Sequence, residues 1–329
     1  MKCGVSYHDH CFDGACSASL FTRFHRECIG TAQEFSYHGL MHRADALFDE
    51  STLVDGENAI VDFKYSTSPR VNWWFDHHQS AFLTPDDERD FRESQARLAA
   101  GDPKRGGKFF DPAYVSCTGL IADVARDKYG FNTAPLKDLI YWANIVDGAK
   151  YESAQAAVGM AEPAMKLTMV IESSGEGFVP RVIPLLTEMS LQQVLDQPFV
   201  QKEFGPLMKK HLEGIELLRE RAVLHRGVIT FDIMDHLVEG YNKFIPYYLH
   251  PEAVYTVGLS RSSFRTKISV GTNPWTTVPL DKLANLAAIC ERYGGGGHAR
   301  VGAISFPPDK AEKARAAAAE ISEELRARA

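Results

Sequence analysis

Histidines and aspartates that could bind a metal ion recur in the first half of this 329-residue sequence. They form three groups along the chain, followed by a fourth candidate that ends the apolar run YWANIVD: His8, Asp9, His10 and Asp13; Asp62; Asp76, His77 and His78; and Asp147. Carboxylates with a minority of imidazoles suit Mn²⁺, Mg²⁺ or Fe²⁺ better than a structural zinc site. A carboxylate shared by two ions about 4 Å apart is the arrangement that assists phosphoryl displacement.

Each of the first three groups follows, or ends, a segment with the pattern of a short strand: KCGVSY, NAIVDF and VNWWF. Apolar residues from Ala15 to Cys28 have helical spacing, so strand, polar turn and helix begin an α/β unit. Ligand sites in such sheets gather at the carboxyl ends of the strands. A single Asp after a strand is ordinarily a turn residue, and it is the repetition at successive strand ends that predicts a metal site.

The rest of the sequence predicts a second domain. Residues 85–112 are charged and Gly-rich, which predicts an exposed insertion with one short helix. Helical periodicity follows at 116–128, 136–146 and 153–172, and residues 200–225 predict a long connecting helix. Strand-like runs at 227–232, 254–259, 266–270 and 301–306 alternate with helices at 281–293 and at the end of the sequence. We expect a first domain over 1–190, a helical linker over 191–226 and a smaller α/β domain over 227–329.

Composition narrows the class of protein. Apolar residues make up 45% of the chain and charged residues 24%, as in globular proteins with packed cores. The formal charge of -7 argues against long nucleic acid held mainly by phosphate neutralisation. Six cysteines without a CxxC pair predict reduced thiols and a cytoplasmic protein. The sequence shows no apolar stretch for a signal peptide or a membrane span, so we expect no membrane partner.

Four consecutive glycines near the end of the chain are a second candidate site. Gly294 to Gly297 follow the apolar helix LANLAAICERY and precede a strand, so they differ from a Gly/Ser linker. Glycine backbone amides can approach an anion closely, and His298 and Arg300 could add charge. A helix stop followed by a tight turn is the alternative.

Arg261, Arg265 and Lys267 form a second basic group, which we expect on one face of one strand. Trp73 and Trp74 are expected in the core.

These motifs together resemble a known family. Asp76-His77-His78 after an apolar strand, with HDHCFDGACSA and Asp62 before it, resembles the DHH phosphoesterases, and GGGGHARVG resembles the signature of the DHHA1 domain that accompanies them. The resemblance covers both ends of the chain, whereas residues 150–250 match nothing. It implies a parallel-sheet DHH domain with flanking helices and a smaller DHHA1 domain. Members include RecJ-type exonucleases, nucleases of very short oligonucleotides (the nanoRNases), cyclic-dinucleotide hydrolases and pyrophosphatases.

The resemblance also implies roles for individual residues. His8, Asp13, His77 and Asp147 would bind two Mn²⁺ ions, with Asp62 as the bridge. Asp76 would orient His77, and His78 would face the substrate phosphate. Where many members have a second Asp this chain has Cys11, so either His10 or, less readily, Asp9 substitutes, or the first ion is held more weakly. The residues expected to bind substrate are Arg265, Gly295, Gly296, Gly297, His298 and Arg300.

The resemblance and the acidic composition together predict a Mn²⁺-dependent phosphoesterase, with Mg²⁺ or Fe²⁺ as alternative ions. Its expected substrate is a short oligonucleotide or a small nucleotide, cleaved by a two-metal mechanism. Three alternatives stay open: a single-strand exonuclease, a pyrophosphatase, and a nucleotide-binding regulator with a weakened metal site. A homodimer is also compatible with the sequence.

Overall fold

The chain folds into two compact units in the computed structural model, which describes residues 2–41, 48–99, 106–237 and 240–329. The first unit comprises Met1–Tyr151 and Ala161–Leu207, and the second comprises Glu152–Met160 and Met208–Ala329. The last of the three divisions between the units falls within one long helix, α9 (Pro198–Arg221), which lies in the segment expected as a linker.

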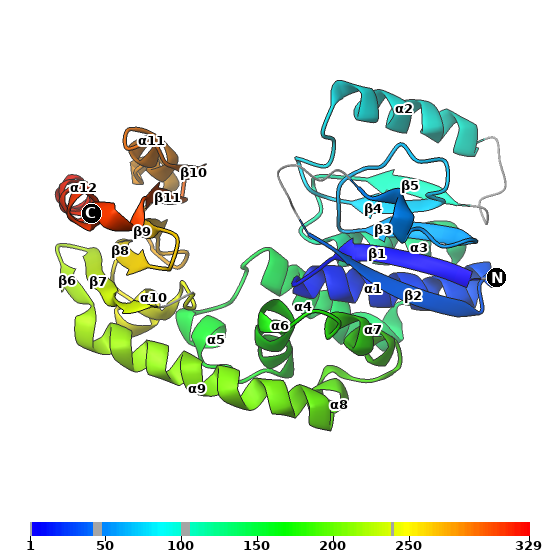
Figure 1. Cartoon of the computed structure of the whole chain (residues 1–329), viewed down its shortest axis with the longest axis horizontal. Coiled ribbons are helices and arrows are strands. Elements are labelled where there is room, and N and C mark those ends of the chain that lie inside the picture. The colour runs from blue at the N-terminus through cyan, green and yellow to red at the C-terminus, as the bar shows by residue number, and fades with distance from the viewer. Residues whose placement is uncertain (1, 42–47, 100–105, 238–239) are drawn as a thin grey trace. The chain divides into compact units, whose positions relative to one another are not determined.

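The first unit is built on a five-stranded parallel sheet with the order β2-β1-β3-β4-β5 (Figure 1). Its strands are β1 (Lys2–His8), β2 (Glu34–Leu40), β3 (Glu57–Val61), β4 (Trp73–Asp76) and β5 (Gly107–Phe110). Its helices are α1 (Phe12–Phe24), α2 (Pro85–Ala99), α3 (Cys117–Tyr129), α4 (Lys137–Asp147), α6 (Pro163–Ser173), α7 (Val179–Glu188) and α8 (Leu191–Leu195). A five-residue π-helix, His25–Ile29, continues α1. The expected parallel-sheet domain with flanking helices is therefore confirmed.

Alternation along β4 gives the sheet two apolar faces. Trp73 and Phe75 belong to the core shared with α1 and α3, whereas Trp74 belongs to a separate aromatic cluster with Phe91 of α2 and Phe110 of β5. Neighbouring residues of a strand point to opposite faces, so each face of the sheet is covered by its own helices. Figure 1 shows α2 on one side of the sheet and α1 on the other. Trp73 and Trp74 are fully buried, which confirms their expected place in the core.

The expectation for residues 85–112 is wrong in part. The predicted helix is present as α2, but Gly107–Phe110 forms the fifth strand of the sheet and pairs with β4. The surrounding charge hides this short strand in the sequence, because only four residues enter the sheet. Residues 153–172 also differ from the expectation, since α5 (Ala154–Val158) and α6 are separate helices broken before Pro163.

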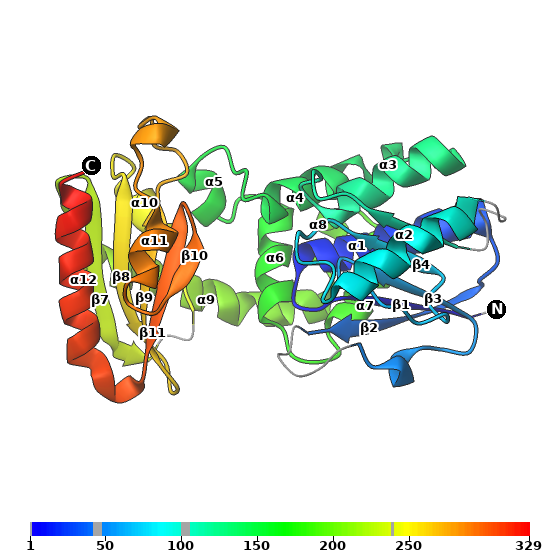
Figure 2. The same ribbon diagram turned by 90° about the horizontal axis from the view of Figure 1, so that it is seen from above.

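The second unit contains a six-stranded mixed sheet with the order β10-β11-β9-β8-β7-β6 (Figure 2). Its strands are β6 (Val223–His225), β7 (Val228–Leu237), β8 (Tyr255–Arg261), β9 (Thr266–Thr272), β10 (Gly296–His298) and β11 (Val301–Phe306). Besides α5, its helices are α10 (Ile245–Leu249), α11 (Leu286–Glu291) and α12 (Ala311–Arg326). The side chains of Val257, Ile268, Val270 and Ile304 pack in one apolar core with α11 and α12. A smaller α/β domain at this end of the chain is thus confirmed.

The expectation that Arg261, Arg265 and Lys267 share one face of one strand is wrong. Arg261 ends β8 and Lys267 lies in β9. The tight turn between the two strands is closed by a hydrogen bond from Ser262 N to Arg265 O at 2.9 Å. Arg261 pairs with Thr266, whereas Lys267 pairs with Ser260. Because paired residues of antiparallel strands lie on the same face, Arg261 and Lys267 are directed to opposite faces.

No helix within the described ranges is both long enough and apolar enough to cross a bilayer.

Candidate metal centre

The carboxyl ends of β1, β3 and β4 bring the expected ligands together with the end of α4. Three groups have ligand atoms within 4.8 Å of one another: His8, Cys11 and Asp62; Asp62, His77 and His78; and Asp13, His77 and Asp147. The helix α1 approaches β1 so closely that a Cβ on Gly14 would lie 2.1 Å from His8 O. This contact explains the glycine after Asp13, since only glycine fits there.

Asp62 lies between the other groups. Its side chain is 1% exposed, with Oδ2 3.5 Å from His8 Nδ1 and Oδ1 3.5 Å from His77 Nε2. Its φ of 56° is uncommon for a residue other than glycine, and such strain concentrates at functional sites. Neither carboxylate oxygen accepts a hydrogen bond at normal distance. The carboxylate therefore presents one oxygen to each of two ligand groups, the geometry of a bridge.

His77 is oriented by the backbone. Its Nδ1 lies 3.1 Å from Tyr114 O, which requires a proton on Nδ1 and directs Nε2 to the carboxylates. Nε2 is buried without a hydrogen bond and lies 3.5 Å from Asp147 Oδ2 and 3.9 Å from Asp13 Oδ2. A cation among these groups would take the Nε2 lone pair in place of a proton. The role of Tyr114 was not predicted, because a carbonyl acceptor carries no sequence signal.

Asp76 supports the turn rather than the His77 ring. Its Oδ1 accepts hydrogen bonds from His77 N at 2.8 Å and from His78 N at 3.2 Å, and it lies 2.7 Å from His78 Nδ1. Asp76 therefore orients the imidazole of His78, whereas the expectation assigned it to His77. The His78 side chain is 36% exposed, so its remaining nitrogen is accessible to a substrate.

Asp13 is held by the start of α3. Its Oδ2 accepts a hydrogen bond from Cys117 N at 2.7 Å and its Oδ1 accepts one from Thr118 N at 3.1 Å. Ser116 caps this helix, accepting from Gly119 N. Amides at a helix start favour a carboxylate. They fix Asp13 beside His77 although the two residues are far apart in sequence.

His10 and Asp9 lie outside the three groups. Asp9 Oδ1 accepts hydrogen bonds from His10 N at 2.9 Å and from Tyr7 Oη at 3.4 Å. The Asp9 carboxyl packs over Gly39 of β2, where a Cβ would lie 2.3 Å from Oδ2. Instead of these two residues, the structure places Cys11 beside His8 and Asp62.

Burial and neighbouring charges shift the pKa values of the expected metal ligands. Burial, with Asp62 and then Asp147 nearby, raises the pKa of Asp13 well above its usual value. Burial acts in the same direction on Asp62, but the imidazoles of His77 and His8 outweigh it and lower the pKa of Asp62 to about 2. Burial opposes protonation of His77, yet Asp62 and Asp13 raise its pKa to about 9. The hydrogen bond to Asp76 raises the pKa of His78.

The glycine run forms a strand and its approach, not an open loop. Gly294 has a φ of 77° and follows α11, while Gly296, Gly297 and His298 form β10, paired with β11. A Cβ on Gly295 would lie 2.3 Å from Ala303 O, and one on Gly297 would lie 2.2 Å from Val301 O. These glycines are required by close packing of two backbones. An anion-binding role for them stays a prediction.

The basic candidates of the second unit lie toward the two ends of β11, because Lys267 pairs with Ser305 whereas Arg300 directly precedes Val301. Arg300 follows β10 and donates from Nη2 to Asn273 O at 3.3 Å. Arg265 donates from Nη1 to Ser305 Oγ at 3.4 Å, and burial, Arg265 and Lys243 lower the pKa of Lys267. His298 is exposed. A bound anion would offset the repulsion between such neighbouring cations.

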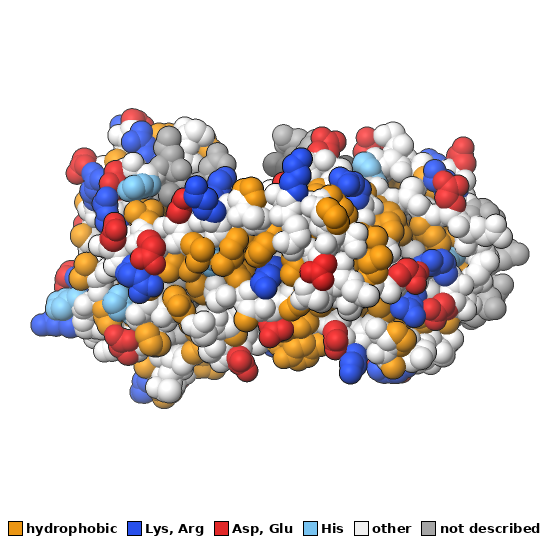
Figure 3. Space-filling model, turned by 90° about the horizontal axis from the view of Figure 1, so that it is seen from below, with side chains coloured by type: hydrophobic (Ala, Val, Ile, Leu, Met, Phe, Trp, Pro, Cys, Tyr) orange, Lys and Arg blue, Asp and Glu red, His pale blue; other side chains and the backbone are white. Residues whose placement is uncertain are grey.

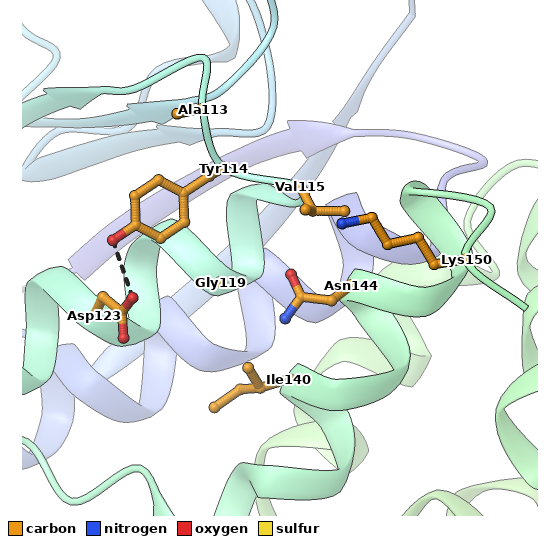
Figure 4. Close-up of a pocket in the computed structure, with 8 residues that line it drawn as sticks. All are labelled: Ala113, Tyr114, Val115, Gly119, Asp123, Ile140, Asn144 and Lys150. Carbon is orange, nitrogen blue, oxygen red and sulfur yellow. Dashed lines mark hydrogen bonds between the residues drawn. The ribbon is translucent and has the colours of Figure 1, made fainter. Parts of the chain in front are cut away.

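A separate cavity of about 470 Å³ in the first unit is lined by residues of α3, of α4 and of the segments beside them. Figure 4 shows that α3 and α4 form its walls, with Tyr114 directed to Asp123 and Lys150 directed to Val115. The cavity contains none of the three ligand groups, although Tyr114 belongs to both surroundings. The candidate chemistry is therefore at the strand ends and not in this cavity.

No protein-family model matches the sequence, and no curated protein matches it. Solved structures do resemble it. The pGpG-specific phosphodiesterase PggH from Vibrio cholerae is similar at 16% identity with a TM-score of 0.70, covering 100% of both chains. A DHH domain from a protein described as a member of a family of ribosomal proteins is similar at 16% identity with a TM-score of 0.54, covering 97% of this chain and 86% of that one. These similarities confirm the DHH/DHHA1 fold that the motifs predict.

Proposed function

We propose that the chain is a metal-dependent phosphoesterase that hydrolyses short oligonucleotides or small nucleotides. The observation that carries the proposal is the bridge geometry of Asp62, a buried carboxylate that presents one oxygen to each of two ligand groups. Buried carboxylates without hydrogen bonds are costly unless they are neutralised or bind a cation. A pair of divalent ions would neutralise the buried carboxylate and bind both of its oxygens.

The residues present suit two ions of the Mn²⁺ or Mg²⁺ type. His8 and Asp62 would hold one, and Asp13, His77 and Asp147 the other, with Asp62 shared. Asp62 Oδ1 and Oδ2 and His77 Nε2 are buried without hydrogen bonds, so each has a lone pair for an ion. When bound, the ions would lower the pKa of water and stabilise charge on phosphoryl oxygens.

The remaining residues of the site would position and neutralise the substrate. His78 donates to Asp76, which favours its charged form and leaves the other ring nitrogen as a donor to a phosphate oxygen. The same nitrogen could protonate the leaving oxygen. Asp76 would keep the imidazole in this orientation without touching the substrate.

The second unit carries basic residues of its own that suit an anionic ligand. Arg265 and Lys267 lie close together beside Ser305 of β11, whereas His298 ends β10 and Arg300 belongs to the turn between β10 and β11. We propose that these residues, with Gly295, Gly296 and Gly297, bind a second phosphate or a base edge. Arginine is suited to this by its two-pronged geometry.

A small substrate agrees with the charge of the chain. Figure 3 shows Lys and Arg side chains interspersed with Asp and Glu on the face in view, as expected for a net charge of -7. Long single-stranded substrates are usually bound by a continuous basic groove with aromatic platforms. The full-length similarity to a pGpG-specific phosphodiesterase favours a linear dinucleotide as the first substrate to test. None of the six cysteines, all of which lie in the described ranges, forms a disulfide, which fits the cytoplasm expected from the sequence.

The decisive experiment is a substrate panel with Mn²⁺ and the purified chain. It would compare pGpG, di- to pentaribonucleotides, cyclic dinucleotides, bisphosphorylated adenosine, pyrophosphate and long single-stranded DNA. We expect fastest turnover of the dinucleotide or the shortest oligonucleotides, and a raised KM in Arg265→Gln. Equal turnover of long DNA would overturn the small-substrate assignment. Tight nucleotide binding without hydrolysis of any panel member would instead support a regulator.

A further inference from the structure

Cys11 lies at the start of α1, beside two of the expected ligands. It is the N-cap residue of α1, with φ -128° and ψ 130°, yet its side chain makes no capping hydrogen bond. Ser, Thr, Asp or Asn would normally stand at such a position. Cys11 forms no disulfide, and its Sγ lies with His8 and Asp62 in one group of possible ligands.

The surroundings of Cys11 point to a cation. Ligand atoms around a small ion lie about 3–4 Å from one another. The atoms of His8, Cys11 and Asp62 are within 4.8 Å, so small side-chain movements would close the site. Asp62 supplies an independent sign, because both of its buried oxygens accept no hydrogen bond. One imidazole, one sulfur and one carboxylate form an ordinary ligand set for a borderline cation.

We infer that the Cys11 sulfur is a metal ligand, and that the position formed by His8, Cys11 and Asp62 prefers Zn²⁺, Co²⁺ or Fe²⁺ to Mn²⁺. Thiolate is a soft ligand that favours these ions over Mn²⁺ and Mg²⁺. The thiol proton is released to solvent as the sulfur–metal bond forms. The inference rests on the proposed function only because it concerns the same metal site.

The opposite group of ligands has a different chemistry. Asp13 and Asp147 contribute two carboxylates and His77 one imidazole, with no sulfur among them. Oxygen-rich sets suit Mn²⁺ and Mg²⁺. The two positions that share Asp62 are therefore unequal, and the chain would hold one borderline and one hard ion when both are available.

Cobalt provides a spectroscopic test that does not depend on activity. The purified, metal-free protein would be titrated with Co²⁺ while its near-ultraviolet absorption is recorded, because sulfur bound to Co²⁺ gives an intense charge-transfer band. We expect the band in the native protein and in Cys28→Ser, and its loss in Cys11→Ser. Cys28→Ser is the matched control, since it makes the same exchange of sulfur for oxygen in the same unit, away from the three ligand groups. A native protein without the band, or a band unchanged in Cys11→Ser, overturns the inference.

A competition experiment tests the preference itself. Cys11→Asp replaces sulfur by oxygen while keeping a ligand, so it should fold and bind metal even if Cys11→Ser does not. We expect the ratio of Zn²⁺ to Mn²⁺ affinity at this position to fall by about tenfold or more in Cys11→Asp. An unchanged ratio would show that Cys11 takes no part in binding.

These measurements separate the two proposals. If the cobalt band depends on Cys11 but no phosphoester is cleaved, the ligand assignment stands and the hydrolase proposal fails. If phosphoesters are cleaved with Mn²⁺ and the band is absent, the hydrolase proposal stands and Cys11 is not a ligand.

Discussion

The two ends of the first sheet both bury histidine beside carboxylate, but in different ways. At the amino ends of the strands, His25 Nε2 lies 2.7 Å from Glu57 Oε2, and Trp73 Nε1 donates to the same oxygen at 3.3 Å. At the carboxyl ends, Asp62 is separated by 3.5 Å from both His8 and His77. In the first arrangement the carboxylate is hydrogen-bonded to its neighbours, although His25 Nδ1 is buried without a partner, whereas in the second the carboxylate stands apart from both imidazoles.

This difference indicates a structural role for the amino ends of the strands and a metal-binding role for the carboxyl ends. At the amino ends, the imidazole and the indole satisfy the carboxylate directly, so Glu57 needs no further partner. At the carboxyl ends, both oxygens of Asp62 and Nε2 of His77 are buried without a hydrogen bond, which is stable only with partial protonation or a cation. Burial of charge alone therefore does not mark the site; buried groups held apart do.

Asp62→Asn should give the largest effect. The amide removes the charge that two ligand groups share, so we expect turnover with Mn²⁺ to fall by about 10³-fold or more, equivalent to about 4 kcal/mol of transition-state stabilisation. Initial rates on the best substrate of the panel measure this. Asp138→Asn, at the exposed start of α4, is the matched control and should keep full activity. Full activity of Asp62→Asn would remove Asp62 from the site.

Metal removal should destabilise the native chain by the next largest amount. Ions bound at about 100 times their dissociation constant contribute about 2.7 kcal/mol to the folded state. For a unit of this size that corresponds to a Tm shift of about 5–10 °C. Thermal unfolding with excess Mn²⁺ and with a chelator measures the shift. We expect it in Glu57→Gln and not in Asp62→Asn, and a chelator effect of equal size in both variants would contradict the comparison.

Much of the site was predictable because its ligands follow apolar runs. His8, Asp62 and His77 stand at the ends of β1, β3 and β4, and the carboxyl ends of parallel strands meet at one edge. Cys11 was identified in the sequence as a departure, but its position beside His8 depends on how α1 begins. The partners Tyr114 O, Cys117 N and Thr118 N are backbone groups, so only the fold could reveal them.

The secondary-structure predictions were wrong where the local sequence pattern did not reveal how the strands pair. Gly107–Phe110 is too short and too close to charged residues to be recognised, yet β4 provides a partner for it. Glu34–Leu40 was missed for a similar reason, since its mixed burial follows from its edge position beside β1. The turn at 262–265 contains neither glycine nor proline, so alternation continued through it in the sequence although the chain reverses.

Glu57→Gln should reduce stability without affecting metal binding. The variant loses a charged acceptor for His25 and Trp73 in a buried place, which costs about 1–3 kcal/mol. Urea unfolding of the chelated protein measures this, and Glu34→Gln on the exposed start of β2 should change little. If Glu57→Gln instead altered the Mn²⁺ affinity, the two ends of the sheet could not be treated as independent.

The pH dependence of that loss is the finest test. Burial opposes ionisation of Glu57, but the contacts with His25, Thr31 and Trp73 outweigh it and lower its pKa below the ordinary value of 4.5. A carboxyl with a lowered pKa in the folded state binds its proton more readily when unfolded. Its stabilising effect is therefore complete above the unfolded pKa and disappears as pH falls through the folded one.

Consequently the difference in unfolding free energy between the native protein and Glu57→Gln should be constant above about pH 5.5 and should shrink below about pH 4.5. Taking the difference removes the contribution of the other carboxyl groups, which titrate in both proteins. A difference that grows as the pH falls would mean that Glu57 is protonated in the folded state. The amino end of the sheet would then hold an uncompensated acid, like the carboxyl end, and closure of hydrogen bonds would no longer distinguish the two.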